Sequence, residues 1–214
     1  MKITDTIYQV DDVFGGTFVL VGEQYLSLVD TGVPGSEGKV FALIESLGRK
    51  PGDLKHILLT HSDGDHIGCL PALVEATGAA VYAQRDEAEV IAGTRQSRGG
   101  SFVQKPVKVS RVVAEGDVLA LHGGIQVIES FGHTVGHVCY YLLSEKALIV
   151  GDCLVNLEGL SGSIPKYTYN AEQAVATVKK LAALGPDSPC FGHGPANVGG
   201  AAAALALLRD RVSA

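Results

Sequence analysis

The sequence predicts an α/β fold, and three observations support this prediction. Runs rich in β-branched and apolar residues alternate with runs of helical periodicity along most of the chain, which is the order typical of α/β proteins. The first thirty residues hold only short strand-like runs separated by turns, so an antiparallel meander begins the fold. With 214 residues, 46% hydrophobic and 19% charged, the chain suits a single globular domain spanning residues 1–214.

The meander has predicted strands at residues 3–10, 17–21 and 25–29. The last of these ends in Asp30-Thr31-Gly32, so Asp30 is either part of a turn or a carboxylate that supports metal ligands. A helix follows Ser36, a candidate N-cap, and Gly48 ends it. Its apolar positions have helical spacing: Val40, Leu43, Ile44 and Leu47.

The central segment continues the alternation of strands and helices. A buried strand covers Ile57 to Leu59 and leads into a loop, and Pro71 then fits the first turn of a helix that ends near Gly78. A strand at 80–83 and a helix at 85–92 come next. The turn-rich basic segment at 93–105 is expected to be an exposed connection, or else a wall that meets an anionic group through Arg95 or Arg98.

The C-terminal half repeats the same pattern. Asn170 is expected to cap a helix, with Gln173 completing a capping box, and a last helix runs from about Gly200 to Val212. Residues 139–143 and 147–150 read as a hairpin. The other predicted strands cover 107–113, 118–121, 125–130 and 190–191.

Composition limits the classes of partner and of compartment. The net charge of -6 argues against a nucleic acid or an anionic membrane and leaves a small-molecule substrate; the oligomeric state stays open. Acidic residues interrupt the N-terminal segment, and no run reaches membrane-spanning length, so we expect a cytoplasmic protein. The four cysteines have no CxxC spacing, which predicts buried thiols, with Cys69 and Cys153 as candidates for a functional role.

The segment HILLTHSDGDHIG is the richest in metal-binding side chains. His61, Asp63, Asp65 and His66 supply imidazoles and carboxylates, which zinc, iron and manganese all accept. Adjacent Asp65 and His66 are expected to diverge, whereas the alternate positions His61 and Asp63 can converge on one ion. This spacing favours two ions over one.

Three further strand ends carry a candidate ligand: His133, Asp152 and His193. Because the chain has only seven histidines, chance explains this placement poorly. His56 and His122 lie outside these strand ends and are expected to be structural or solvated. His137 is expected to support its turn.

Four segments of the sequence follow one another in a recognisable order: THSDGDHIG, GHTVGHV, VGDC and FGHG. In this order the sequence resembles the metallo-β-lactamase superfamily, whose corresponding motifs are HxHxDH, GHTxGH, GD and GHG. The resemblance implies an αββα four-layer sandwich. It also implies one metal held by His61, Asp63 and His133, a second held by Asp65, His66 and His193, and Asp152 bridging both. Asp63 stands where the family usually has histidine. The related diiron flavoproteins also carry a carboxylate at this point of the motif, so iron and manganese remain alternatives to the favoured zinc.

The resemblance implies a metal-dependent hydrolase in which a metal-bridging hydroxide attacks an ester, a thioester or a lactone of a small molecule. Asp65 would orient the hydroxide and pass its proton to the leaving group. A non-heme iron oxidoreductase and a non-catalytic metal-binding protein are the alternatives. Open points are the substrate, the ion and its occupancy at the Asp63 side, and any contact of Tyr167, Tyr169, Arg95 or Arg98 with substrate.

Overall fold

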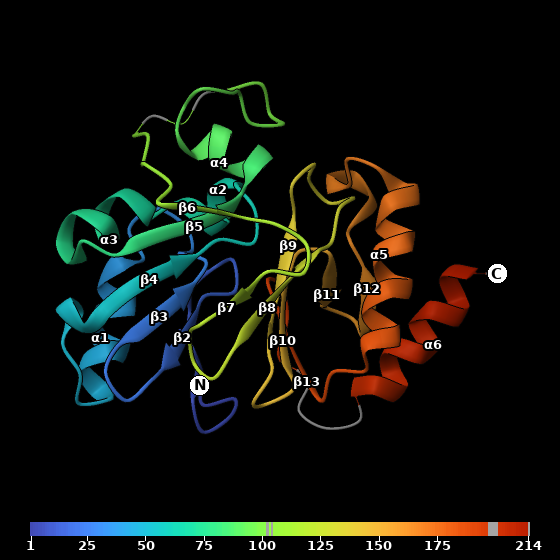
Figure 1. The fold of residues 1–214 in the computed structure, drawn as a ribbon. Coiled ribbons are helices and arrows are strands. Elements are labelled where there is room, and N and C mark those ends of the chain that lie inside the picture. The colour runs from blue at the N-terminus through green and yellow to red at the C-terminus, as the bar shows by residue number, and fades with distance from the viewer. Residues whose placement is uncertain (102, 104, 197–200, 214) are drawn as a thin grey trace. The chain divides into compact units, whose positions relative to one another are not determined.

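The computed structural model describes residues 1–214 except Phe102, Gln104, 197–200 and Ala214. The chain forms two compact units, residues 1–113 (unit 1) and 114–214 (unit 2). Each has its own sheet, helices and hydrophobic core (Figure 1). The expectation of one domain over 1–214 stays a prediction.

Unit 1 contains one six-stranded sheet in the order β1-β2-β3-β4-β5-β6. Strands β1 to β3 pair antiparallel, which confirms the predicted meander, and β3 to β6 pair parallel. The strands are β1 Ile7–Gln9, β2 Phe18–Val21, β3 Leu26–Val29, β4 Leu54–Leu58, β5 Ala80–Gln84 and β6 Arg111–Val113. The helices are α1 Glu37–Ser46, η1 Pro51–Asp53, α2 Gly64–Ile67, α3 Leu70–Thr77 and α4 Arg85–Ile91.

The core of unit 1 joins the sheet to its helices. Val40 and Ile44 of α1 and Leu73 of α3 are fully buried in the same cluster as the apolar side chains of β3, β4 and β5. Burying each such side chain contributes about 1.5–3 kcal/mol relative to leaving it exposed. Helix α1 begins as predicted, but Ser36 is itself helical in its backbone angles, and among the described residues its side chain makes no capping hydrogen bond.

Unit 2 contains a five-stranded sheet in the order β13-β10-β9-β8-β7 and a small β11-β12 hairpin. The β10-β13 pair is parallel and the other pairs are antiparallel, so both large sheets are mixed. The strands are β7 Val118–Leu119, β8 Ile125–Glu129, β9 Val138–Leu142, β10 Ala147–Gly151, β11 Leu154–Asn156, β12 Leu160–Gly162 and β13 Ser188–Phe191. The helices are η2 Pro165–Tyr167, α5 Ala171–Leu184 and α6 Ala201–Ser213.

Helices α5 and α6 pack side by side in unit 2 (Figure 1). Val178 and Leu181 of α5 and Leu205 of α6 are buried with the apolar side chains of β9, β10 and β13. The Asn170 side chain accepts a hydrogen bond of 3.0 Å from the Gln173 backbone, which confirms the predicted N-cap of α5. Gly200, where the last helix was expected to begin, lies outside the described residues.

The topology brings the strand ends that carry polar residues to common edges. Strands β3 and β4 are parallel neighbours, so Asp30 and the segment after Leu58 leave the sheet at the same edge. In unit 2, β10 and β13 are parallel, and Asp152 and His193 follow them at one edge. Within the described residues, no helix is long and apolar enough to span a membrane. The cytoplasmic location stays a prediction.

Candidate metal centre

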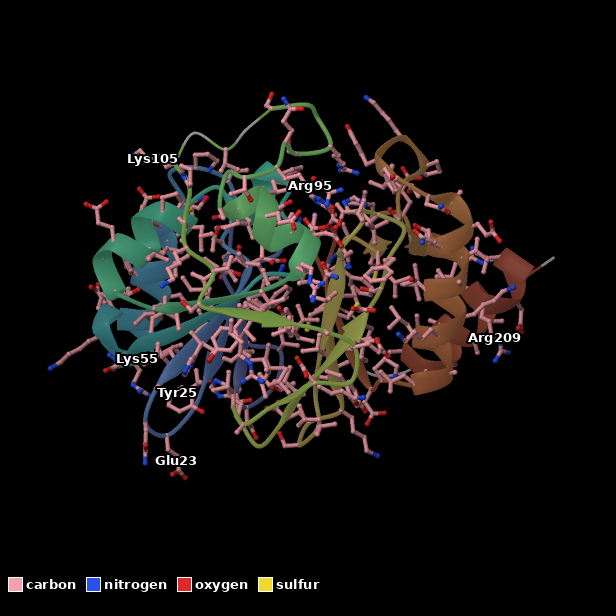
Figure 2. All side chains as sticks on the ribbon, turned by 45° about the horizontal axis from the view of Figure 1, so that its top comes forward. Glu23, Tyr25, Lys55, Arg95, Lys105 and Arg209 are labelled. Atoms are coloured by element: carbon pink, nitrogen blue, oxygen red, sulfur yellow. The ribbon has the colours of Figure 1, made fainter. Side chains whose placement is uncertain are left out.

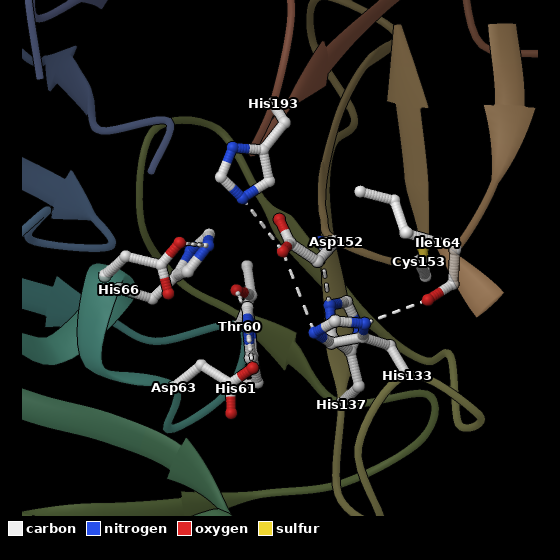
Figure 3. A network of polar contacts seen from close by, with 12 residues as sticks. Thr60, His61, Asp63, His66, His133, His137, Asp152, Cys153, Ile164 and His193 are labelled. Carbon is white, nitrogen blue, oxygen red and sulfur yellow. Dashed lines mark hydrogen bonds and ion pairs between the residues drawn. The ribbon is translucent and has the colours of Figure 1, made fainter. Parts of the chain in front are cut away.

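Unit 1 holds a buried hydrogen-bonded chain that connects two of the predicted metal ligands through Asp30. The Asp30 Oδ2 atom lies 2.8 Å from His66 Nδ1 and accepts a 2.7 Å hydrogen bond from the Thr60 hydroxyl. The Thr60 hydroxyl oxygen also lies 2.9 Å from His61 Nδ1 (Figure 3). The sequence left two roles open for Asp30, and the structure supports the second, that of a carboxylate that supports the predicted metal ligands.

This chain fixes the tautomer of both imidazoles. The Asp30 carboxylate can only accept, so Nδ1 of His66 carries the proton. The Thr60 hydroxyl gives its hydrogen to Asp30, so it accepts the proton on Nδ1 of His61. Both neutral rings then carry their lone pair on Nε2, and both side chains are fully buried. Asp30, His61 and His66 also form a group whose ligand atoms all lie within 4.8 Å of one another.

His66 and Asp65 lie in the short helix α2, although the sequence predicted a loop here. Thr31 holds this helix, because both its backbone nitrogen and its hydroxyl donate to the His66 carbonyl, at 2.7 and 2.9 Å. The expected divergence of Asp65 and His66 is also wrong: Asp65 Oδ2 lies 3.8 Å from His66 Nε2. Consecutive side chains are about 100° apart around a helix, not on opposite faces as in a strand, so the two donors can approach.

His61 and Asp63 converge as the sequence predicted. His61 Nε2 lies 3.7 Å from Asp63 Oδ2. The same Asp63 oxygen forms an ion pair with the Arg98 guanidinium. Ser62, between the two ligands, donates a 2.9 Å backbone hydrogen bond to the buried carboxylate of Glu87 in α4, a support that the sequence analysis missed.

In unit 2, the predicted ligands His133 and His193 lie close to the carboxylate of the third predicted ligand, Asp152 (Figure 3). Asp152 Oδ2 lies 3.1 Å from His193 Nε2 and 3.7 Å from His133 Nε2. These three residues follow β10, β13 and β8, whose C-terminal ends lie at the same edge of the sheet. The predicted placement of these three side chains at strand ends is therefore confirmed within this unit.

The His133 ring is held by Ser163, a residue that the sequence did not indicate. His133 Nδ1 lies 2.9 Å from the Ser163 hydroxyl, which contacts the Thr168 hydroxyl at 2.9 Å. The Thr168 hydroxyl also donates to the Ile164 carbonyl at 2.8 Å. A hydroxyl can donate or accept, so the Ser163 contact holds the His133 ring in place with either tautomer.

His137 supports the Asp152 backbone, in keeping with the supporting role that the sequence predicted, and its ring also lies within 4.8 Å of the sulfur atoms of Cys139 and Cys153. Its Nε2 accepts a 3.2 Å hydrogen bond from the Asp152 backbone nitrogen, so its Nδ1 carries the proton and lies 2.7 Å from the Ser130 hydroxyl. His56 is also structural. It contacts the Ser27 hydroxyl at 3.3 Å and the Tyr25 ring edge-on, and burial lowers its pKa.

All four cysteines are free and buried, which confirms the prediction for them. Burial raises the pKa of the Cys69 thiol to about 11 and that of Cys190 to about 12. Burial also raises the pKa of Cys153 well above its ordinary value, and its sulfur lies 3.4 Å from that of Cys139. Such thiols are poor nucleophiles, so neither Cys69 nor Cys153 is supported as a reactive group.

The loop residues considered for substrate contact differ in their surroundings. Arg95 pairs with Asp86 at 2.6 Å, and Tyr167 and Tyr169 are exposed. The Tyr169 backbone nitrogen donates to the His133 carbonyl at 3.1 Å, so this loop braces the turn that carries His133.

The donors in each unit fit a divalent metal ion. They are imidazoles and carboxylates, the ligand types of zinc, iron and manganese. The hydrogen bonds that hold the far nitrogen of His61, His66 and His133 are of the kind that orients a ligating imidazole. The structure therefore supports metal binding by these side chains.

Comparison with known proteins agrees with this chemistry. The model of the metallo-beta-lactamase superfamily matches residues 11–193. Hydroxyacylglutathione hydrolase of Rhizobium meliloti (strain 1021) is 32% identical over 153 residues, which cover 71% of this chain and 52% of that protein. The chain thus matches about half the length of that relative. The protein YobT of Bacillus subtilis (strain 168), uncharacterized, is 30% identical over 196 residues, covering 83% of this chain and 82% of that protein.

Solved structures show the same fold. A motif mutant of a metallo-beta-lactamase from Cronobacter sakazakii superposes with a TM-score of 0.79 at 21% identity, covering 100% of this chain and 94% of that one. BJP-1, a subclass B3 metallo-beta-lactamase of Bradyrhizobium japonicum, gives 0.74 at 24% identity, covering 100% and 91%. The predicted fold class is confirmed: two mixed sheets flanked by helices. The chain belongs to the metallo-beta-lactamase superfamily.

Proposed function

We propose that this protein is a metal-dependent hydrolase that cleaves a thioester or a related ester or lactone of a small molecule. The observation that carries the proposal is the buried chain from His61 through Thr60 and Asp30 to His66. It orients two imidazole nitrogens within the motif where the family places metal ligands. The similarity to hydroxyacylglutathione hydrolases favours a thioester, although the match covers about half of those proteins.

The proposed ligands come from both units of the chain. His61, Asp63 and His133 would hold one ion, Asp65, His66 and His193 a second, and Asp152 would contact both. Zinc is favoured because imidazole and carboxylate donors suit it, with iron and manganese as alternatives. Bound divalent ions would supply Lewis-acid stabilisation of a carbonyl oxygen and lower the pKa of water toward about 7.

The chain's own residues would position the reactants and move protons. Asp65 is the proposed proton carrier: its carboxylate is partly exposed and lies beside His66, so it can accept a proton from water and give it to the leaving group. Asp30 holds the imidazole of His66 in the tautomer whose lone pair lies on Nε2, and Ser163 holds the ring of His133 in place. His137 holds the Asp152 backbone in place.

The test is a hydrolysis assay of the zinc-loaded full chain with hydroxyacylglutathione, a chromogenic ester and a lactone. We expect thioester cleavage, and we expect His66→Ala and His193→Ala each to reduce kcat/KM by at least about a hundredfold, since either loses a metal ligand. His56→Gln is the matched control, because His56 is structural, and should keep its activity. Near-normal turnover in either alanine variant would refute the ligand assignment. Iron in the purified protein, visible absorption and no hydrolysis would favour the oxidoreductase alternative.

A further inference from the structure

Asp63 and Arg98 form an ion pair inside unit 1. Asp63 occupies the N-cap position of α2, and its backbone carbonyl accepts hydrogen bonds from the first turn, at 2.9 Å from His66 and 3.1 Å from Ile67. An aspartate here usually caps the helix with its side chain as well. Among the described residues, the Asp63 side chain makes no such capping bond, and its Oδ2 atom lies against the Arg98 guanidinium.

The oxygen that pairs with Arg98 is also the one that faces His61. Asp63 Oδ2 lies 3.7 Å from His61 Nε2, close to the roughly 3.4 Å expected between two ligands about 2.1 Å from one tetrahedral ion. A metal held by this nitrogen and this oxygen would lie against the same carboxylate oxygen as the Arg98 guanidinium. Both side chains are largely sheltered, with 17% of Asp63 and 30% of Arg98 exposed, so solvent screens the pair only partly.

We propose that Arg98 is a resident counter-ion that competes with the metal for Asp63. The guanidinium and a divalent ion carry like charges, so they repel each other when both lie against one carboxylate oxygen. The ion whose ligands include His61 and Asp63 therefore binds second and more weakly, and it binds as Arg98 leaves. This inference rests on the proposed metal site and specifies how its two positions differ.

The same loop provides a matched control. Arg95 is three residues away, but it is held elsewhere, at 2.6 Å from Asp86 and 3.7 Å from Glu89, and the hydrogen bond to Asp86 raises its pKa. Figure 2 labels Arg95 and Lys105 on this loop. Loss of the Arg95 charge changes the net charge of the loop by the same amount without touching Asp63. Lysine at position 98 would keep the charge.

The experiment titrates the full chain, first stripped with a chelator, with Zn²⁺ against a competing chromogenic chelator. Arg98→Gln is expected to bind the second equivalent about three- to tenfold more tightly than the unmodified protein. If the ion pair is formed about 70–90% of the time, only about 10–30% of the molecules can bind this ion, which raises the apparent Kd of the unmodified protein about three- to tenfold. The first equivalent should be unchanged. Arg95→Gln and Arg98→Lys should both resemble the unmodified protein.

A structural readout accompanies the affinities. Hydrogen exchange of residues 94–101 should increase when the second equivalent binds to the unmodified protein, since the loop loses its anchor, and should be insensitive to zinc in Arg98→Gln. If Arg98→Gln binds the second equivalent no better, or more weakly, Arg98 positions Asp63 for the metal and the competition is refuted. One equivalent in all variants would refute it too. No zinc binding by any of the proteins would refute the proposed metal site itself.

Discussion

At the scale of single residues, the candidate metal centre is defined by the residues that support its proposed ligands. His61 and His66 share one support, since Asp30 contacts the His66 ring directly and the His61 ring through Thr60. Asp30 is buried and has a left-handed backbone with φ of 57°, a conformation that aspartate and asparagine tolerate better than most residues. The position therefore combines a backbone requirement with a charge requirement, and these can be separated.

The first prediction is that Asp30→Asn keeps the fold and weakens metal binding. Asparagine tolerates the same backbone but lacks the negative charge that orients and polarises the His66 ring. We expect the affinity for Zn²⁺ to fall by about 10–100-fold in a competition titration. Asp12→Asn is the matched control, because Asp12 is exposed and has φ of 56°. Equal affinities in the two variants would mean that Asp30 has only a backbone role.

The candidate ligands were easier to recognise in the sequence than the residues that support them. His61, His66 and His193 are recognisable because motif and strand end coincide in the sequence. Ser163 could not be recognised, because it contacts His133 across 30 residues of chain and serine is common in loops. For Asp30 the sequence left two roles open, a turn residue or a supporting carboxylate, and only the pairing of β3 with β4 places it beside Thr60. Long-range pairing is the information that a single sequence lacks.

At the scale of elements, the helix α2 is held by close backbone contacts as well as by Thr31. A Cβ atom on Gly15 would lie 2.0 Å from the Asp65 carbonyl oxygen, and a Cβ on Gly68 would lie 2.4 Å from the Pro34 nitrogen. Neither approach is possible for a residue with a side chain unless the backbone moves. Thus α2, which carries Asp65 and His66, is fixed by the loops that pack on it.

The second prediction uses this packing. Gly15→Ala should destabilise the metal-free protein by roughly 3 kcal/mol or more in urea unfolding, because strain at φ of 78° is added to the clash with Asp65. Gly35→Ala is the matched control, with φ of 89° and nothing within 4 Å, and should cost only about 1–2 kcal/mol. Zinc affinity should fall in Gly15→Ala alone. Equal losses of stability would show that the Asp65 backbone moves aside freely.

Element length explains which parts of the fold the sequence predicted. Helices α1 and α5 and the strands β2 and β3 have enough residues to show a period, and they were predicted close to their observed bounds, whereas β1 covers only Ile7–Gln9 of the predicted 3–10. Helix α2 has four residues, and β11 and β12 have three each, too few for any periodicity to appear. These short elements form by tertiary contact, which local propensity does not report.

At the scale of the whole molecule, the chain is divided between two units, each with its own core. The alternation of strands and helices predicted the fold class, but nothing in the sequence indicated a boundary near residue 113, because no glycine- or proline-rich linker lies there. The family model nevertheless covers both units, from residue 11 to residue 193. The proposed ligands are distributed in the same way, with His61, Asp63, Asp65 and His66 in unit 1 and the others in unit 2.

This distribution leads to the last prediction, which concerns stability. An ion that binds only the folded chain stabilises it by about 2.7 kcal/mol at a free concentration one hundred times its Kd. For a chain of 214 residues this is an increase in Tm of roughly 5–10 °C, which excess EDTA should reverse. If both units supply ligands, His66→Ala and His193→Ala should each lose most of the increase, although they lie in different units. His122→Asn is the control, because it replaces a histidine in a turn that is not a proposed ligand, and asparagine tolerates its φ of 48°. This variant should keep the full increase in Tm. A full increase in His193→Ala would show that the stabilising ion does not use His193, which would refute its assignment as a ligand.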